Sequence, residues 1–95
     1  MSGDEKITKE MIDDLFALIS SISNVEDCSL LFDDLCTKKE VKQMAQRVRA
    51  AKMLLDGATY NKIIEETDIS SATLSRVSRC VQYGNGYTKF LSEKK

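Results

Sequence analysis

Small, hydroxylated and cationic side chains cluster between residues 70 and 79 of this 95-residue chain. The cluster consists of Ser70, Ser71, Ala72, Thr73, Ser75, Arg76 and Arg79. Hydroxyl groups can bond base edges or phosphates, and an arginine guanidinium can form two parallel hydrogen bonds with guanine. Small residues at the start of a helix also let it sit deep in the major groove of DNA. The segment therefore predicts a helix that reads DNA.

Particular contacts can be assigned within this predicted interface. Base-edge contacts are expected from Ser71, Ala72 and Ser75, and Ser70 is expected to cap the start of the reader helix. Phosphate contacts are expected from Lys62 and Arg79, with Lys52 and Thr59 as further candidates. Arg76 could serve either the DNA or a ligand pocket.

Apolar residues around the segment have the spacing of a helix-turn-helix over residues 59–80. Ile63, Ile69, Leu74 and Val77 lie six, five and three residues apart, which suits two short helices joined by a turn of three to four residues. We expect Ile63 to face inward, Ile69 to fill the corner, and Leu74 and Val77 to form the inner stripe of the second helix. Asp68 stands at the turn, where a left-handed backbone is common.

The rest of the chain predicts a single all-helical domain over residues 1–95. It contains no proline and little alternation of β-branched residues. A broad apolar stripe from Ile7 to Ile22 predicts a first helix over residues 4–23 and could be covered by a second chain. Asn24 is expected to cap a second helix that ends near Cys36, and Thr37 with Glu40 fits a capping box that starts a third.

Later signals predict the end of the third helix and a short sixth one. The stripe of the third helix consists of Val41, Met44, Ala45, Val48, Ala51, Leu54 and Leu55, and Ala45, Ala50 and Ala51 would allow close helix packing. Gly57 is expected to end this helix in a left-handed conformation. After the Gly84-Asn85-Gly86 breaker, a helix over residues 87–92 is expected to be anchored by Phe90 and Leu91.

Charge is segregated along the sequence, although the net charge is only −1. Residues 1–36 hold nine acids and two bases, residues 37–58 six bases and two acids, and residues 59–95 six bases and four acids. An acidic head is thus followed by a basic body that contains the predicted reader helix. The location of charge, rather than its total, decides whether a surface attracts phosphate.

Several other classes of protein fit the sequence poorly. The chain has no histidine, no glycine-rich phosphate loop, no G-x-S-x-G and no metal-ligand cluster, so no catalytic residues and no metal are expected. No apolar run approaches the roughly 18 residues of a membrane span, and the N-terminus is no signal peptide, so a cytoplasmic location is expected. Cys28, Cys36 and Cys80 match no zinc spacing and are expected to be reduced, partly buried thiols.

Two stretches together resemble the Trp repressor family, in its YerC/YecD-type branch of small bacterial regulators. They are QRVRAAKMLLDG (Gln46 to Gly57) and ISSATLSRVSR (Ile69 to Arg79), and the resemblance covers about residues 30–91. It implies a six-helix fold and an intertwined homodimer, formed by residues 1–36 and the last helix, that represses transcription from operator DNA. Two-fold symmetry would place the reader helices about 34–36 Å apart on a near-palindromic site.

The resemblance also implies a possible effector pocket. The founding member of the family holds its corepressor tryptophan between two arginines, which Arg47 and Arg76 match by position, and near the start of the third helix, which Thr37 matches. The residue after the second arginine is glycine in that repressor, whereas Val77 would fill part of the slot here and disfavours tryptophan. Either the pocket takes another small molecule or protein fills it. The turn after the third helix is also one residue shorter, which would shift the angle of the reader helix.

The sequence is therefore consistent with two functions. The first is a sequence-specific regulator of transcription that binds double-stranded DNA and needs no cofactor. The second is a protein-interaction module that docks its helix-turn-helix on the transcription machinery, with the acidic head acting as a mimic of nucleic acid. Binding that weakens steeply with salt would indicate DNA.

Overall fold

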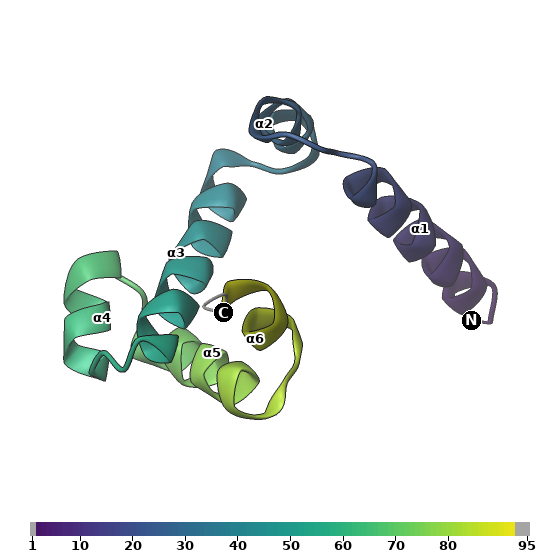
Figure 1. Ribbon diagram of the computed structural model, residues 1–95. Coiled ribbons are helices and arrows are strands. Elements are labelled where there is room, and N and C mark those ends of the chain that lie inside the picture. Colours follow the sequence, from purple (N-terminus) through teal and green to yellow (C-terminus); the bar gives the residue numbers. More distant parts are fainter. Residues whose placement is uncertain (1, 93–95) are drawn as a thin grey trace. The chain divides into compact units, whose positions relative to one another are not determined.

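The computed structural model describes residues 2–92 and, within that range, the side chains from Thr8 onward. The described residues form six helices and no strand, in an all-α fold. The helices are α1 (Ser2–Ser20), α2 (Val25–Leu35), α3 (Lys38–Leu55), α4 (Tyr60–Thr67), α5 (Ser71–Tyr83) and α6 (Gly86–Leu91). They fall into an N-terminal unit, Met1–Thr37, and a C-terminal unit, Lys38–Lys95 (Figure 1). The prediction that all 95 residues form one domain stays a prediction.

The N-terminal unit contains α1 and α2. The first helix ends at Ser20 rather than at Ser23, because the hydroxyls of Ser20 and Ser21 donate to the carbonyl oxygens of Ala17 (3.0 Å) and Leu18 (2.7 Å) and compete with the helical pattern. The side chain of Asn24 caps α2 as predicted, since its Oδ1 accepts from the backbone N–H of Asp27 at 2.8 Å.

Apolar side chains of both N-terminal helices are open to solvent within one chain. No residue of α2 is buried, and Val25 is 80% exposed. On α1, Phe16 is 62% exposed and Met11 61% exposed. The described part of the predicted stripe is thus only partly covered: Leu15, Ile19 and Ile22 are half-buried, whereas Met11, Ile12, Phe16 and Leu18 are exposed. The side chain of Ile7 lies outside the described residues.

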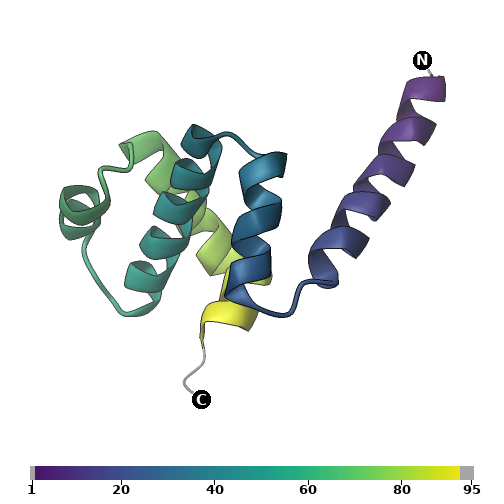
Figure 2. The same cartoon turned by 90° about the horizontal axis from the view of Figure 1, so that it is seen from above.

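The C-terminal unit is organised around the second half of α3. This helix packs against α4, α5 and α6, with α4 and α6 on opposite sides of it in both views (Figures 1 and 2). Its two buried residues are Ala50 and Ala51, whose short side chains allow the close approach predicted for them. The stripe predicted along the whole helix is only partly correct, because Val41, Ala45 and Val48 are exposed.

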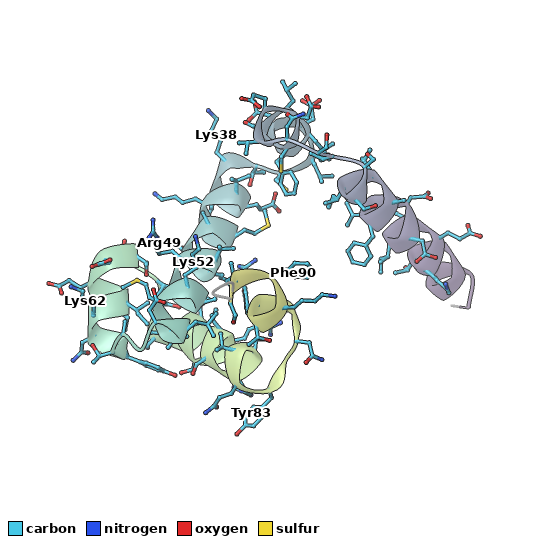
Figure 3. All side chains as sticks on the ribbon, in the orientation of Figure 1. Lys38, Arg49, Lys52, Lys62, Tyr83 and Phe90 are labelled. Atoms are coloured by element: carbon cyan, nitrogen blue, oxygen red, sulfur yellow. The ribbon has the colours of Figure 1, made fainter. Side chains whose placement is uncertain are left out.

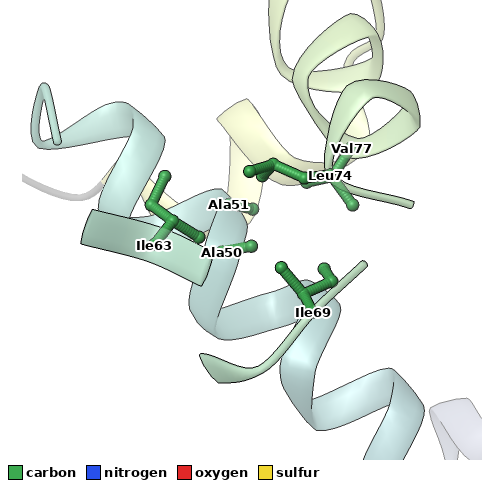
Figure 4. Packing of buried hydrophobic residues seen from close by; sticks show 6 residues of the cluster. All are labelled: Ala50, Ala51, Ile63, Ile69, Leu74 and Val77. Carbon is green, nitrogen blue, oxygen red and sulfur yellow. The ribbon is translucent and has the colours of Figure 1, made fainter. Parts of the chain in front are cut away.

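A compact core holds the helix-turn-helix on α3 (Figure 4). Ile63 of α4, Ile69 of the turn, and Leu74 and Val77 of α5 are each no more than 3% exposed and pack with the two alanines. These four are the residues that the spacing predicted to face inward. Each would lose about 1.5–3 kcal/mol of hydrophobic stabilisation if it were left in water.

The last helix is anchored differently from the prediction. Tyr87 and Leu91, which lie four residues apart on one face, pack against the core. Phe90 is 76% exposed, with the Lys89 ammonium 5.5 Å from its ring centroid. The prediction that Phe90 anchors this helix is wrong. In a helix of six residues only one face can meet the core, and when Tyr87 and Leu91 occupy that face the side chain of Phe90 points to solvent.

The end of α3 is a Schellman motif built on Gly57, which has a φ of +88°. The backbone N–H of Ala58 donates to Met53 O at 2.9 Å, and that of Gly57 donates to Leu54 O at 3.0 Å. A Cβ on Gly57 would meet no atom within 4 Å, so only the backbone conformation opposes a side chain here.

Gly57→Ala is therefore expected to lower the free energy of unfolding by about 1–2 kcal/mol, measured by urea denaturation. Gly86→Ala is the matched control, because a Cβ there also meets nothing within 4 Å and its φ is not positive. An equal loss in both variants would contradict a conformational cause.

Candidate nucleic-acid interface

The turn between α4 and α5 consists of Asp68, Ile69 and Ser70. Asp68 adopts the left-handed conformation predicted for it, with φ 63° and ψ 19°, and its N–H donates to Ile64 O at 2.9 Å. The Thr67 hydroxyl donates to Ile63 O at 2.7 Å and accepts from the N–H of Ile69 at 3.2 Å. These local bonds set the angle at which α5 leaves the turn.

A long-range hydrogen bond ties the turn to α3. The side-chain Nε2 of Gln46 donates to Thr67 O at 2.9 Å, across 21 residues of sequence. Both groups are partly buried, which strengthens the bond relative to one at the surface. The helix-turn-helix is therefore held by polar and apolar contacts to α3 together.

The outward side of α5 carries the residues predicted to read DNA. Leu74 and Val77 face the core, while Ser71, Ala72, Ser75, Arg76 and Arg79 are all exposed. Given 100° per residue, these five positions fall within one arc of about 140° on the helix surface. These residues therefore share one side of the helix. Those near its N-terminal end could contact base edges, and those near its C-terminal end could contact phosphates.

Two of the hydroxyls predicted to contact DNA are also capping groups. The Oγ1 of Thr59 accepts from the N–H of Lys62 at 3.2 Å, at the start of α4. The Oγ of Ser70 accepts from the N–H of Thr73 at 3.2 Å and donates to Thr73 Oγ1 at 2.9 Å. The Ser70 hydroxyl is therefore engaged within the protein, in the cap of α5.

Positive charge is carried by α3 rather than by the helix-turn-helix. From Tyr60 to Tyr83, three cations are balanced by three acids, and Lys62 lies 3.4 Å from the Glu66 carboxylate in an exposed pair. The third helix holds six cations and one acid. Four of these cations recur at helical spacing along an exposed stripe of α3: Lys38, Lys42, Arg49 and Lys52. Three of them, Lys38, Arg49 and Lys52, are labelled in Figure 3.

The reader helix is longer than predicted, and its last turn adds exposed residues. It continues past Cys80 to Tyr83 and ends where the N–H of Gly84 donates to Cys80 O at 2.8 Å. Gln82 and Tyr83 are exposed there and were not among the predicted contacts. The sequence did contain a signal for this longer helix. Val81 lies four residues after Val77, so it continues the inner stripe of α5, and it packs on the core.

Beside the turn lies a cavity of about 450 Å³, here called the α3–α5 cavity. It is lined by Gln43, Gln46, Arg47, Asp68, Ile69, Ser70 and Thr73. Of the three residues predicted for an effector pocket, only Arg47 lines it, while Arg76 is exposed on α5. Thr37 belongs to the N-terminal unit, and its role in a pocket stays a prediction.

Other functional groups are sparse in the described part of the chain. No three of its His, Cys, Asp and Glu side chains lie where they could hold a metal ion. None of the helices that the structure describes has the length and hydropathy needed to cross a membrane. All three cysteines are free; Cys28 and Cys36 are half-buried as predicted, but Cys80 is exposed on α5.

Comparison with known proteins agrees with this arrangement. A profile of the family described as Trp repressor protein matches residues 10–95. The uncharacterised protein YerC of Bacillus subtilis (strain 168) is 48% identical over 81 residues, which are 85% of this chain and 78% of YerC.

Two solved structures are also similar to the chain over most of its length. A candidate Trp repressor from Staphylococcus aureus superposes with a TM-score of 0.83 at 44% identity, covering 92% of this chain and 88% of that one. A TrpR-like protein from Eubacterium eligens ATCC 27750 gives a TM-score of 0.82 at 38% identity, covering 90% and 89%. The chain therefore belongs to the Trp repressor family of DNA-binding transcription regulators, in its YerC-type branch.

Proposed function

We propose that this protein is a sequence-specific repressor that reads a near-palindromic operator as a homodimer in the cytoplasm. The observation that carries the proposal is the outward arc of α5, where five small, hydroxylated or cationic residues are exposed on a helix fixed to α3. Base-edge contacts would come from Ser71, Ala72 and Ser75, near the N-terminal end of the helix, where helix-turn-helix proteins read bases.

The phosphate contacts would come from several elements. Arg79 and Arg76 lie further along α5, and Lys62 and Thr59 lie at the start of α4. Because the helix-turn-helix itself carries no net charge, Lys52 and the other exposed cations of α3 would supply much of the attraction to the DNA backbone. Ser70 would act by capping and orienting the reader helix.

The exposed apolar side chains of α1 and α2 support the homodimer. Val25, Phe16 and Met11 are each more than half exposed in a single chain. Large exposed apolar side chains in such number often mark an interface. A second copy of the chain would cover it, and a two-fold dimer presents two copies of α5 to a symmetric site.

Binding to genomic DNA fragments across a series of salt concentrations tests the proposal. We expect log K to fall steeply and linearly with log salt, because each phosphate contact releases counterions. A sequence-specific complex should also persist against excess competitor DNA. Little binding at any salt concentration would contradict the proposal and favour an interaction with protein.

Arg79→Ala is expected to weaken binding to all DNA sequences alike and to lower the salt slope by about one. The reason is that an exposed arginine near the end of α5 would contact phosphate, which carries no sequence information. Lys89→Ala is the matched control, since it removes an exposed cation from α6. Fluorescence anisotropy with a specific and a random duplex measures both effects; a loss confined to the specific duplex would assign Arg79 to a base instead.

A further inference from the structure

The exposed cations of α3 form one continuous surface, here called the α3 stripe. It consists of Lys38, Lys42, Arg49 and Lys52. Given the turn and rise of an α-helix, these positions fall within an arc of about 80° and span about 21 Å along the helix. None of the four side chains forms an ion pair with a residue that the structure describes. The stripe is therefore a cationic track without an anionic partner in the described part of the chain.

The α3 stripe faces away from the outward arc of α5. Ala50 and Ala51, the buried residues of α3, lie on the opposite side of that helix from the stripe by helical phase. The outward arc of α5 in turn lies opposite Leu74 and Val77, which pack with these alanines. A duplex bound to α5 would therefore be attracted by the long-range field of the stripe, while the four side chains stay available to another polyanion.

A second cavity lies at the C-terminal end of the stripe, where α3 meets α6, and is here called the α3–α6 cavity. Its volume of about 450 Å³ falls within the range of small-molecule sites. Its lining combines the last two cations of the stripe, Arg49 and Lys52, with three apolar side chains, those of Met53, Leu55 and Leu91. Cationic and apolar groups thus lie together here, and phosphates alone would leave the apolar groups without a partner.

Asp56 and Ser92 add polar groups to the lining of the α3–α6 cavity. A carboxylate accepts hydrogen bonds from the exocyclic amino group of a base, and a hydroxyl can donate or accept. The Asp56 carboxylate would also repel a phosphate placed inside the cavity, which favours a base there and the phosphates along the stripe. The bases of a duplex are paired and stacked, whereas those of a single strand can turn outward into a cavity.

We propose that the α3 stripe and the α3–α6 cavity together bind single-stranded nucleic acid, with its phosphates along the stripe and one unstacked base in the cavity. Proteins bind single strands by combining cations that follow the backbone with side chains that receive the bases. This surface is separate from the outward arc of α5, so single-strand binding does not rest on the proposed reading of an operator.

Fluorescence anisotropy of labelled strands with the full-length chain tests the proposal. Strands of DNA and of RNA, each about ten nucleotides long, are compared with abasic strands of the same length, which keep the phosphates but lack the bases. We expect DNA, RNA or both to bind at least about tenfold more tightly than the abasic strand, because a base in the cavity adds contacts that the abasic strand cannot make. The tighter of the two identifies the sugar that the surface prefers.

Substitution of the two cations that line both the stripe and the cavity supplies the second arm. Arg49→Gln combined with Lys52→Gln should weaken single-strand binding at least about tenfold and lower the salt slope by about 1.4, since each phosphate contact contributes about 0.7 for a single strand. Lys9→Gln combined with Lys89→Gln is the matched control, because it removes two exposed cations outside the stripe and the cavity. Circular dichroism checks that both double variants keep the helical fold.

Arg79→Ala separates this surface from the one proposed to read an operator. Because Arg79 lies on the outward arc of α5, this variant should leave the affinity for a single strand within about twofold of the wild type. The proposal is overturned if the abasic strand binds as tightly as strands with bases or if no single strand binds. It is also overturned if the control or Arg79→Ala weakens single-strand binding as much as the loss of Arg49 and Lys52 does.

Discussion

Phe16→Glu is expected to convert the proposed homodimer into monomers and to abolish detectable operator binding. Phe16 is 62% exposed in the single chain and lies on the apolar side of α1. A large aromatic residue at the centre of an interface typically contributes 2 kcal/mol or more. Two-fold symmetry places the substitution twice in each dimer, so a loss of about 4 kcal/mol is expected, or roughly a thousandfold in the dimerisation constant.

Ala17→Glu is the matched control for this change. It introduces the same charge on the next residue of the same helix, and Ala17 faces away from the apolar stripe by the helical phase. Sedimentation equilibrium would measure the dimerisation constant, and anisotropy would measure DNA binding. A Phe16→Glu protein that remains dimeric would show that α1 is not the interface.

Leu74→Ala is expected to lower the free energy of unfolding by about 2–5 kcal/mol. Leu74 is 0% exposed and belongs to a core of six buried residues in the part of the chain that the structure describes, so few neighbours can move to fill the space. Because small domains are stable by only about 5–15 kcal/mol, this single change should lower the melting temperature by about 10 °C or more.

Gln82→Ala is a suitable control on the same helix, because Gln82 is exposed. It should leave stability within about 0.5 kcal/mol of the wild type. Urea denaturation followed by circular dichroism measures both variants. A Leu74→Ala protein as stable as the wild type would contradict the role of this core in fixing α5 on α3.

The helix-turn-helix could be predicted from the sequence because its signals are local. The inward positions of Ile63, Ile69, Leu74 and Val77 follow from helical spacing, and the core confirms them. The caps at Asn24 and Ser70 follow from the preference of short polar side chains for helix starts, and both form the expected hydrogen bonds.

Features that depend on tertiary contacts could not be predicted in the same way. The choice of Tyr87 over Phe90 as the anchor of α6 depends on where a six-residue helix meets the core, and either residue has a suitable apolar side chain. The exposure of Val48 on α3 has a similar cause, since helical spacing identifies an apolar side without saying how much of it another element covers.

Only part of the lining of the α3–α5 cavity could be predicted from the sequence. Arg47 was predicted to line an effector pocket together with Thr37 and Arg76, and it lines a cavity to which neither of these two residues contributes. Gln43 and Asp68 were not predicted, because the cavity brings together residues about 25 positions apart whose proximity depends on the packing of α3 against the turn. No local pattern reports such proximity.

Selection of binding sites from a pool of random duplexes tests the central claim most directly. If two copies of α5 read DNA as proposed, the selected sequences should converge on two inverted half-sites with centres about 10–10.5 base pairs apart. Recovery of unenriched sequence, or of a single half-site without a symmetric partner, would contradict the reading of an operator by a two-fold dimer.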